Sequence, residues 1–255
     1  MYVLLFSLVF SNSGCVSTAP TPDPFAAGTL VRGANLEIKL DWLQINVIPN
    51  SKYKLNNTYI IEINSNESVL PRKFEFNGLD DVIIVLRSKK TNRTISLSAD
   101  GAMFEILSGV TLVLDGNITL VGRPENLAPL VYVKNGTLIL EPGSSITGNT
   151  NNSFGGGVHI TDNGTFIMNG GTVSGNTALG GGGVFVSDGT FTKTGGVITG
   201  SDSEDGNAAS QSDGGSAVYA RDTSGAAKRK EITSGLDDNL FFSSSANMFT
   251  GSWDD

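Results

Sequence analysis

Short stretches in which apolar and polar residues alternate recur along most of this chain at a nearly constant spacing. One column of apolar positions repeats at intervals of 27, 27, 26 and 34 residues, and it comprises Phe104, Val131, Val158, Val184 and Val218. Another column follows two residues later, and it comprises Ile106, Val133, Ile160, Val186 and Ala220. Because successive side chains of a strand point to opposite faces, both columns point inward. The pattern predicts a strand that recurs in successive structural repeats.

Two further strands complete each repeat. The second strand contributes Leu112, Leu138, Phe166 and Phe191, followed two residues later by Leu114, Leu140, Met168 and Lys193. The third strand contributes Ile118, Ile146, Val173 and Ile198. Three strands in about 26 residues, with no helical period between them, argue against a βαβ fold. They predict an all-β protein, a single-stranded parallel β-helix of about six coils.

Two polar positions stand out in this repeat. Asn149 and Asn176 follow the same turn in successive coils, so we expect their side chains to form a hydrogen-bonded ladder along the axis that ends at Ser201. Lys193 occupies an otherwise apolar column, and it predicts that regular packing ends nearby.

A single amphipathic helix is expected before the first coil. Leu36, Leu40 and Leu43 share one helical face, Asn35 is a suitable N-cap, and Pro49 ends the segment. We therefore predict a helix from Asn35 to Val47 that covers the open end of the apolar core. Packing on the side of the coil is the alternative. Upstream strands are expected at Tyr59 to Ile63, Phe74 to Phe76, Val82 to Leu86 and Ile95 to Leu97.

The N-terminus resembles a bacterial lipoprotein signal peptide. A short apolar run from Tyr2 to Phe10 precedes Gly14 and Cys15, and a Pro-rich stretch follows. No Lys or Arg precedes the run, and Asn12 stands where an aliphatic residue is usual. We expect acylation of Cys15, a membrane anchor through the attached lipid, and export. A plain secretory signal is the alternative.

These patterns divide the chain into five segments. They are a signal segment (1–15), a flexible linker (16–32), a cap helix (33–48), the β-helix (49–222) and an irregular C-terminal cap or tail (223–255). The last segment has Phe241, Phe242, Phe249 and Trp253 available to cover the final coil.

The composition of the chain argues against several classes of function and site. The net charge of −8 argues against binding to nucleic acid. The single cysteine excludes an intrachain disulfide and a cysteine-based zinc site. No cofactor is expected.

The repeats resemble a known group of proteins. GGGVHITDNGTFIMNGGTVSGN, which returns as GGGVFVSDGTFTKTGGVITGS, is similar to the repeats of bacterial surface lipoproteins with a pectate-lyase-like β-helix, over about Tyr59 to Ala220. Two shorter stretches, Gly215 to Ala220 and Phe166 to Asn169, also resemble motifs of polymorphic outer-membrane adhesins. The resemblance implies a right-handed coil and a place in the outer membrane or on the cell surface.

Pectate-lyase-like folds include polysaccharide lyases and glycosidases, so a catalytic pair of carboxylates is one hypothesis. Asp115 and Glu141 occupy related turns one coil apart, near the separation of a retaining glycosidase pair. The same column continues as Asn169 and Thr194, which is typical of solvated turn residues. The pattern favours solvated turn residues over a catalytic pair.

An aromatic stripe is the best candidate for binding. Tyr132, His159, Phe185 and Tyr219 share one outward column, which begins at Glu105. Such a stripe could stack sugar rings or contact a partner protein. Pairing between coils, which stabilises the sheet, is the simpler interpretation.

An acidic loop is the one candidate for a metal. It contains Asp202, Glu204, Asp205 and Asp213, whose oxygens could bind calcium. The loop lacks the spacing of an EF-hand, and a solvated loop is the favoured interpretation.

The sequence thus favours a non-catalytic, lipid-anchored β-helix with a structural or adhesive role, whose ligand is a polysaccharide or a surface or host protein. A carbohydrate-active enzyme is the alternative, and a decayed repeat protein without a separate role is a third hypothesis.

Overall fold

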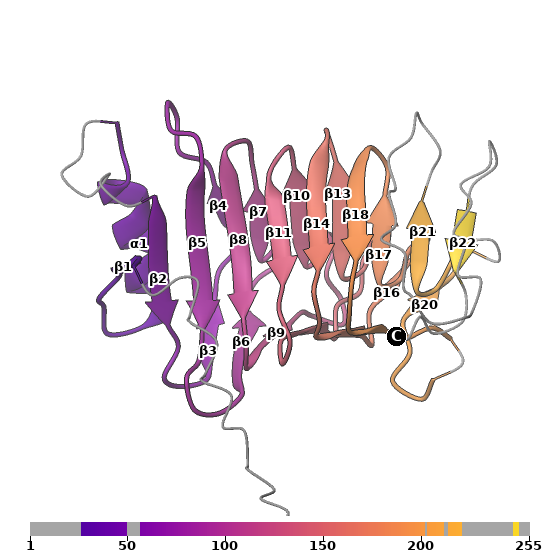
Figure 1. Ribbon diagram of the computed structural model, residues 1–255. Coiled ribbons are helices and arrows are strands. Elements are labelled where there is room, and N and C mark those ends of the chain that lie inside the picture. Colours follow the sequence, from indigo (N-terminus) through magenta and orange to yellow (C-terminus); the bar gives the residue numbers. More distant parts are fainter. Residues whose placement is uncertain (1–26, 50–56, 202, 212–213, 221–246, 250–255) are drawn as a thin grey trace, which may run out of the picture.

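The chain forms a right-handed parallel β-helix of about six coils. The computed structural model describes residues 27–49, 57–201, 203–211, 214–220 and 247–249. Figure 1 shows the strands side by side along one axis, with the single helix at the N-terminal end. Each coil contributes one strand to each of three sheets, so the sequence repeat and the structural repeat coincide.

The three long sheets are called A, B and C. Sheet A consists of β1 (Thr29–Leu30), β2 (Thr58–Glu62), β5 (Val82–Arg87), β8 (Val110–Asp115), β11 (Thr137–Leu140), β14 (Gly164–Met168) and β18 (Gly189–Lys193). Sheet B consists of β3 (Glu67–Val69), β6 (Arg93–Leu97), β9 (Ile118–Val121), β12 (Ser145–Thr147), β15 (Thr172–Ser174) and β19 (Val197–Ile198). Sheet C consists of β4 (Arg72–Phe74), β7 (Phe104–Ile106), β10 (Val131–Lys134), β13 (Val158–Thr161), β17 (Val184–Val186), β21 (Val218–Ala220) and β22 (Asn247–Phe249).

Two strands add local variation at the C-terminal coils. β16 (Thr177–Ala178) and β20 (Ala208–Ala209) form a short fourth sheet. The last strand, β22, pairs with β21 in the antiparallel direction. It lies within the segment expected to be irregular, of which residues 223–246 and 250–255 lie outside the described residues.

The predicted inward columns are confirmed in sheets A and C. Val131 pairs with both Phe104 and Val158, and Leu138 pairs with both Leu112 and Phe166. These side chains are buried in one continuous core. Lys193 also holds its place in the column beside Met168 and is buried.

The column of sheet B needs one correction. Ile146 pairs with Leu120, whereas Ile118 pairs with Arg93 of the preceding coil. Ile118 and Leu120 are both buried, because they lie two residues apart on the inward face of β9. Alternation alone could not choose between them, and the distance of 26 residues from Leu120 to Ile146 is the one that matches the neighbouring sheet.

The glycine triplets explain why the coils stack closely at one corner. Gly155 and Gly181 have φ angles of +73° and +64°, in the left-handed region that disfavours other residues. The third glycine of each triplet leaves no room for a side chain. A Cβ at Gly157 would lie 2.7 Å from the carbonyl oxygen of Gly183 in the next coil. The triplets therefore mark a tight turn followed by close backbone approach.

A ladder of buried asparagines runs along the same region. Asn126 donates to Asn149 Oδ1 at 3.0 Å, the backbone N–H of Asn149 donates to Asn176 Oδ1 at 3.2 Å, and Asn176 donates to Asn207 Oδ1 at 3.0 Å. The expectation that Ser201 ends the ladder is wrong. Six more residues, 201 to 206, precede Asn207 in the sequence, and Asn207 takes the next position of the ladder.

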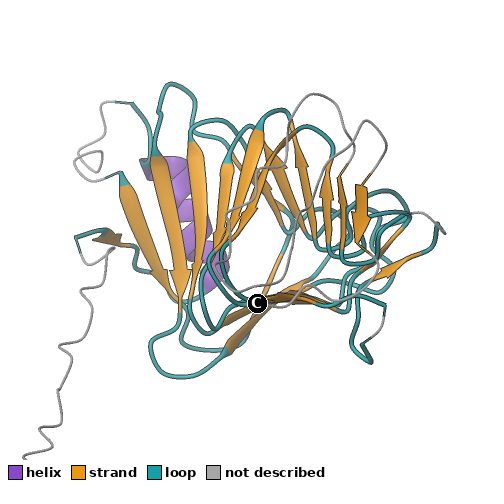
Figure 2. Cartoon of the chain, turned by 45° about the vertical axis from the view of Figure 1, so that its right-hand side comes forward, coloured by secondary structure: helices purple, strands orange, loops and turns teal. Residues whose placement is uncertain are grey.

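The helix α1 (Leu36–Asn46) covers the N-terminal end of the core, as predicted. Asn35 is its N-cap, and the Asn35 side chain accepts a hydrogen bond from the Ile38 N–H at 2.9 Å. The side chains of Leu36, Leu40 and Leu43 are fully buried in the main core. In Figure 2 the helix lies at the end of the stack of strands.

Polar contacts fix the helix to the first coil. Arg72 of β4 forms ion pairs with Glu37 and, at 2.8 Å, with Asp41. Glu37 also accepts a hydrogen bond from the Leu70 N–H at 2.7 Å, and Gln44 donates one to the Lys73 carbonyl at 2.7 Å. β1, which lies in the segment expected to be a flexible linker, pairs with β2 beside this helix.

Candidate binding face

The aromatic column expected from the sequence forms on the outer face of sheet C. Tyr132, His159, Phe185 and Tyr219 are consecutive partners in β10, β13, β17 and β21. The ring centroids of Tyr132 and His159 are 4.8 Å apart, those of His159 and Phe185 are also 4.8 Å apart, and those of Phe185 and Tyr219 are 5.3 Å apart. The four rings therefore form a continuous row of contacts, in which Tyr132 stacks on His159, His159 meets Phe185 edge to face, and Phe185 stacks on Tyr219.

The expectation that all four rings are exposed is wrong. Phe185 is 2% exposed and Tyr219 is 8% exposed. Phe154, from the turn before β13, stacks on Phe185 at 4.8 Å and lies 6.1 Å from Tyr219. Gly180 lies against the Phe154 and Tyr219 rings, since a Cβ at this position would lie 3.1 Å from each of them. Sequence reasoning missed Phe154, although a large apolar residue before a glycine triplet is a usable signal.

The accessible part of the column is the pair Tyr132 and His159, both of which are partly exposed. Lys134 adds a charged group beside this pair. Its Nζ lies 4.6 Å from the centroid of the Tyr132 ring and 3.0 Å from Glu105 Oε1. The hydrogen bond from Lys134 to Glu105 raises the pKa of Lys134, so this cation persists at neutral pH.

His159 also contacts a hydroxyl that the sequence did not single out. His159 Nε2 lies 3.1 Å from Ser187 Oγ, and Ser187 Oγ donates to the Ile160 carbonyl at 3.1 Å. The contact orients the imidazole ring on the outer face of sheet C.

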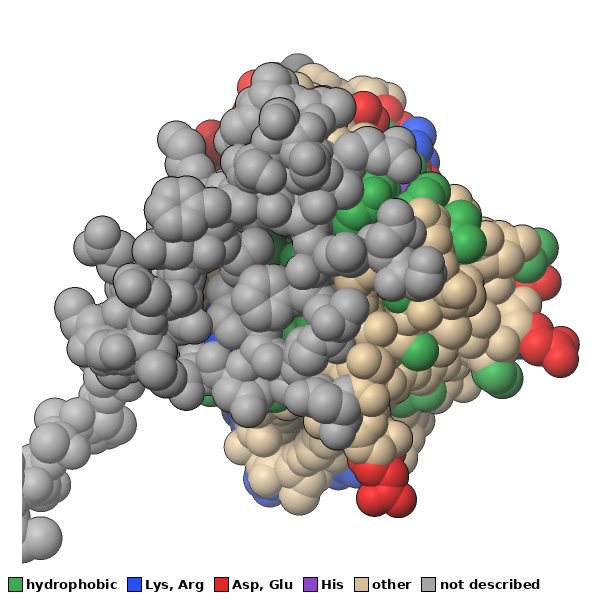
Figure 3. Space-filling view, turned by 90° about the vertical axis from the view of Figure 1, so that its right-hand side faces the viewer, with side chains coloured by type: hydrophobic (Ala, Val, Ile, Leu, Met, Phe, Trp, Pro, Cys, Tyr) green, Lys and Arg blue, Asp and Glu red, His purple; other side chains and the backbone are tan. Residues whose placement is uncertain are grey.

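In Figure 3, which views the C-terminal end, hydrophobic side chains gather in the upper part of the view. Acidic and basic side chains lie next to them. The outer face of sheet C thus combines the Tyr132 and His159 rings with the charged groups of Lys134 and Glu105.

The two carboxylates considered as a catalytic pair lie at the ends of neighbouring strands of sheet A, since Asp115 is the last residue of β8 and Glu141 follows β11. Leu114 pairs with Leu140, so Asp115 and Glu141 occupy adjacent coils. Asp115 Oδ2 lies 3.9 Å from Arg87 Nη1, and Glu141 Oε1 accepts a hydrogen bond from Asn169 at 2.9 Å. Each carboxylate contacts a polar residue of a neighbouring coil, and the catalytic role stays a prediction.

The acidic loop is described only in part. Asp202 and Asp213 lie outside the described residues, while Glu204 and Asp205 are exposed. In the described part of the chain, no three His, Cys, Asp or Glu side chains are grouped so that they could hold a metal ion. The calcium hypothesis for this loop stays a prediction.

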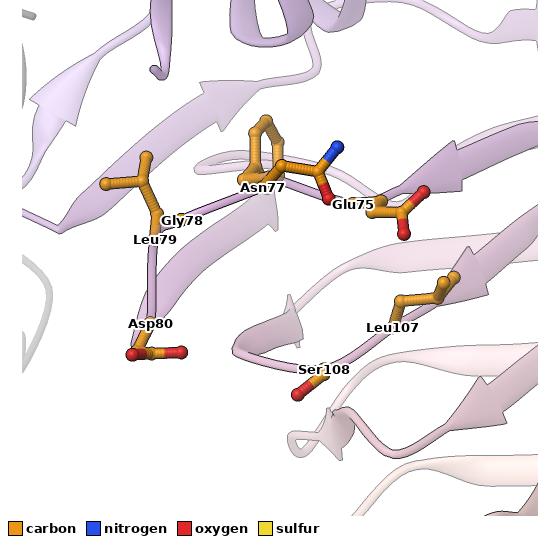
Figure 4. A pocket seen from close by; sticks show the side chains of 8 residues that line it. Glu75, Asn77, Gly78, Leu79, Asp80, Leu107 and Ser108 are labelled. Atoms are coloured by element: carbon orange, nitrogen blue, oxygen red, sulfur yellow. The ribbon is translucent and has the colours of Figure 1, made fainter. Parts of the chain in front are cut away.

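A small hollow lies at the turn after β4 (Figure 4). It has a volume of about 190 Å³ and is lined by polar groups that include Asn77, Asp80 and Ser108. In Figure 4, Asp80 and Ser108 lie on one side of the hollow and Glu75 and Asn77 on the other. Glu75 forms an ion pair with Lys73 at 2.8 Å, so its charge is balanced locally.

Cys15 lies outside the described residues. The described part of the chain contains no helix that is long and apolar enough to cross a membrane. Comparison of the chain with known protein families, with curated proteins and with solved structures finds no match.

Proposed function

We propose that this protein is an exported, lipid-anchored and non-catalytic β-helix that binds a ligand on the outer face of sheet C. The proposal rests on one observation, the partly exposed Tyr132 and His159 rings stacked at 4.8 Å beside Lys134 and Glu105. A saccharide fits this surface best. The C–H face of a sugar ring stacks on the aromatic rings, and its hydroxyls reach the charged groups.

The rest of the column supports the rigidity of this surface. Phe185 and Tyr219 are buried beneath Phe154, so they hold the next two coils in register with His159. A platform whose supporting side chains are packed loses little conformational entropy when a ligand binds. The buried rings thus support the face from its C-terminal side. The ligand contacts are limited to the partly exposed rings of Tyr132 and His159.

The binding experiment uses the double variant Tyr132→Ser with His159→Ser. Each stacked ring contributes about 0.5–1.5 kcal/mol, so we expect affinity for the best saccharide of a glycan array to fall by roughly tenfold or more. The matched control is Thr165→Ala with Thr190→Ala on the outer face of sheet A, which should bind like the wild type. Circular dichroism checks that both variants keep the β-helix.

Two outcomes would count against this proposal. If the double variant binds like the wild type, the stripe serves only to pair the coils. If a folded wild-type protein instead cleaves a polysaccharide, and Asp115→Asn or Glu141→Gln abolishes the cleavage, the protein is a carbohydrate-active enzyme. A partner protein as the ligand would appear as binding to host-matrix proteins with the same loss in the double variant.

The lipid anchor has a separate test at Cys15. We expect cells that express the protein to incorporate radiolabelled palmitate into it and to retain it in the membrane fraction. Cys15→Ser should abolish the label and release the protein, because no other cysteine is present. Equal retention without label in both proteins would contradict the anchor.

A further inference from the structure

A second hollow lies at the N-terminal end of the coil, away from the aromatic column. It has a volume of about 220 Å³ and lies between the end of β1, the helix α1 and the end of β2. Arg32, Lys39, Glu62 and Asn64 supply the polar groups of its wall. These residues come from three separate elements, and the docking of the helix on the first coil brings them together.

Lys39 is the unusual member of this wall, because it is 6% exposed. Its aliphatic chain packs against Gly33, where a Cβ would lie 2.8 Å from Lys39 Cγ. Within the described part of the chain, its ammonium group donates one hydrogen bond, to the Glu62 carbonyl oxygen at 2.7 Å. An ammonium group has three N–H donors, so a carbonyl oxygen satisfies only part of its hydrogen-bonding capacity.

The charge of Lys39 is not balanced by a carboxylate within the described residues. The carboxylate of Glu62, which lines the same hollow, faces other cations, with Lys89 Nζ at 2.6 Å and Arg87 Nη2 at 3.5 Å. These contacts, with the hydrogen bond from Lys89 as the largest cause, lower the pKa of Glu62. Glu62 is therefore an anion whose charge is already balanced by Lys89 and Arg87.

The surroundings of the hollow are thus positive on a protein of net charge −8. A buried cation without a counter-ion is costly, and an anion that enters from solvent removes this cost. Arg32 is exposed at the rim, where its guanidinium can form paired hydrogen bonds to an oxyanion. We propose that this hollow binds a small oxyanion, such as the carboxylate of an acidic sugar or a phosphate group, through Lys39 and Arg32.

The test is isothermal titration calorimetry of the full chain with D-galacturonate, with inorganic phosphate and with neutral D-galactose. We expect saturable binding of one or both anions and none of galactose, because the site recognises charge. Preference for galacturonate would identify an acidic saccharide as the source, and preference for phosphate would identify a phosphorylated ligand. The loss of one charge-assisted hydrogen bond in Lys39→Met should weaken binding by roughly tenfold or more.

The control is Lys73→Met, which removes an exposed lysine paired with Glu75 in sheet C and should bind like the wild type. The melting temperature of Lys39→Met without anion should stay close to that of the wild type, since the removal of an unbalanced charge offsets the lost hydrogen bond to the Glu62 carbonyl. Equal anion binding by Lys39→Met and wild type, or no binding by the wild type, would overturn the proposal. The aromatic double variant should keep this site, so the two proposals fail independently.

Discussion

Asn176→Ala should unfold at a much lower urea concentration than the wild type. The Asn176 side chain is fully buried, and it donates to the carbonyls of Ile146 and Ser174 at 3.1 and 2.9 Å. It also joins Asn149 to Asn207. Alanine leaves several of these buried groups without a partner, at about 1–3 kcal/mol each, so we expect a loss of roughly 3–6 kcal/mol in the free energy of unfolding.

Asn169→Ala is the matched control. Asn169 is exposed, and its side chain bonds Glu141 and Thr194 at 2.9 and 3.1 Å on the outer surface. Water replaces those bonds, so the loss should stay within about 0.5 kcal/mol. Similar midpoints for the two variants in urea would show that the ladder adds nothing beyond ordinary surface hydrogen bonds.

Phe166→Ala should also be strongly destabilising, because it opens a cavity in the middle of the core. Phe166 is fully buried, pairs with Leu138 and stacks on Phe191 with the ring centroids 5.0 Å apart. Phenylalanine to alanine changes in cores cost about 3–5 kcal/mol. The measurement is the free energy of unfolding from urea denaturation followed by circular dichroism.

Ile167→Ala provides the comparison for this variant. Ile167 is the next residue of β14, but it points outward and is partly exposed. Its truncation should therefore cost about 1 kcal/mol or less. A cost as large as that of Phe166→Ala would contradict the assignment of inward and outward faces.

The architecture was predictable because its information is local and repeated. In each strand the alternation identifies the inward face, and the constant spacing brings like residues into register, as Val131 with Val158 illustrates. Errors arose where one of these signals failed. Ile118 and Leu120 share a face, so alternation could not separate them. Asn207 follows six more residues that change the spacing, so counting residues led to Ser201 instead.

The candidate sites were less predictable, because they depend on turns and on the docking of the helix. The order of the rings from Tyr132 to Tyr219 follows from the register, but their exposure depends on Phe154, which belongs to no strand. Lys39 lies next to Leu40 on a helix whose apolar residues alone suggested its buried face. Lys39 is buried because the helix docks against the end of β1 and against Glu62, and no periodicity in the sequence reveals this docking.

The helix α1 also determines what the N-terminal end of the molecule can become. Parallel coils stack by the same backbone pairing that joins separate chains in cross-β filaments, and an open edge is a template for strand addition. Here Glu37 accepts a hydrogen bond from the Leu70 N–H, and Gln44 donates one to the Lys73 carbonyl oxygen. A second copy therefore finds these groups of the first coil already bonded. By covering this end, the helix hinders the addition of further coils before the first one.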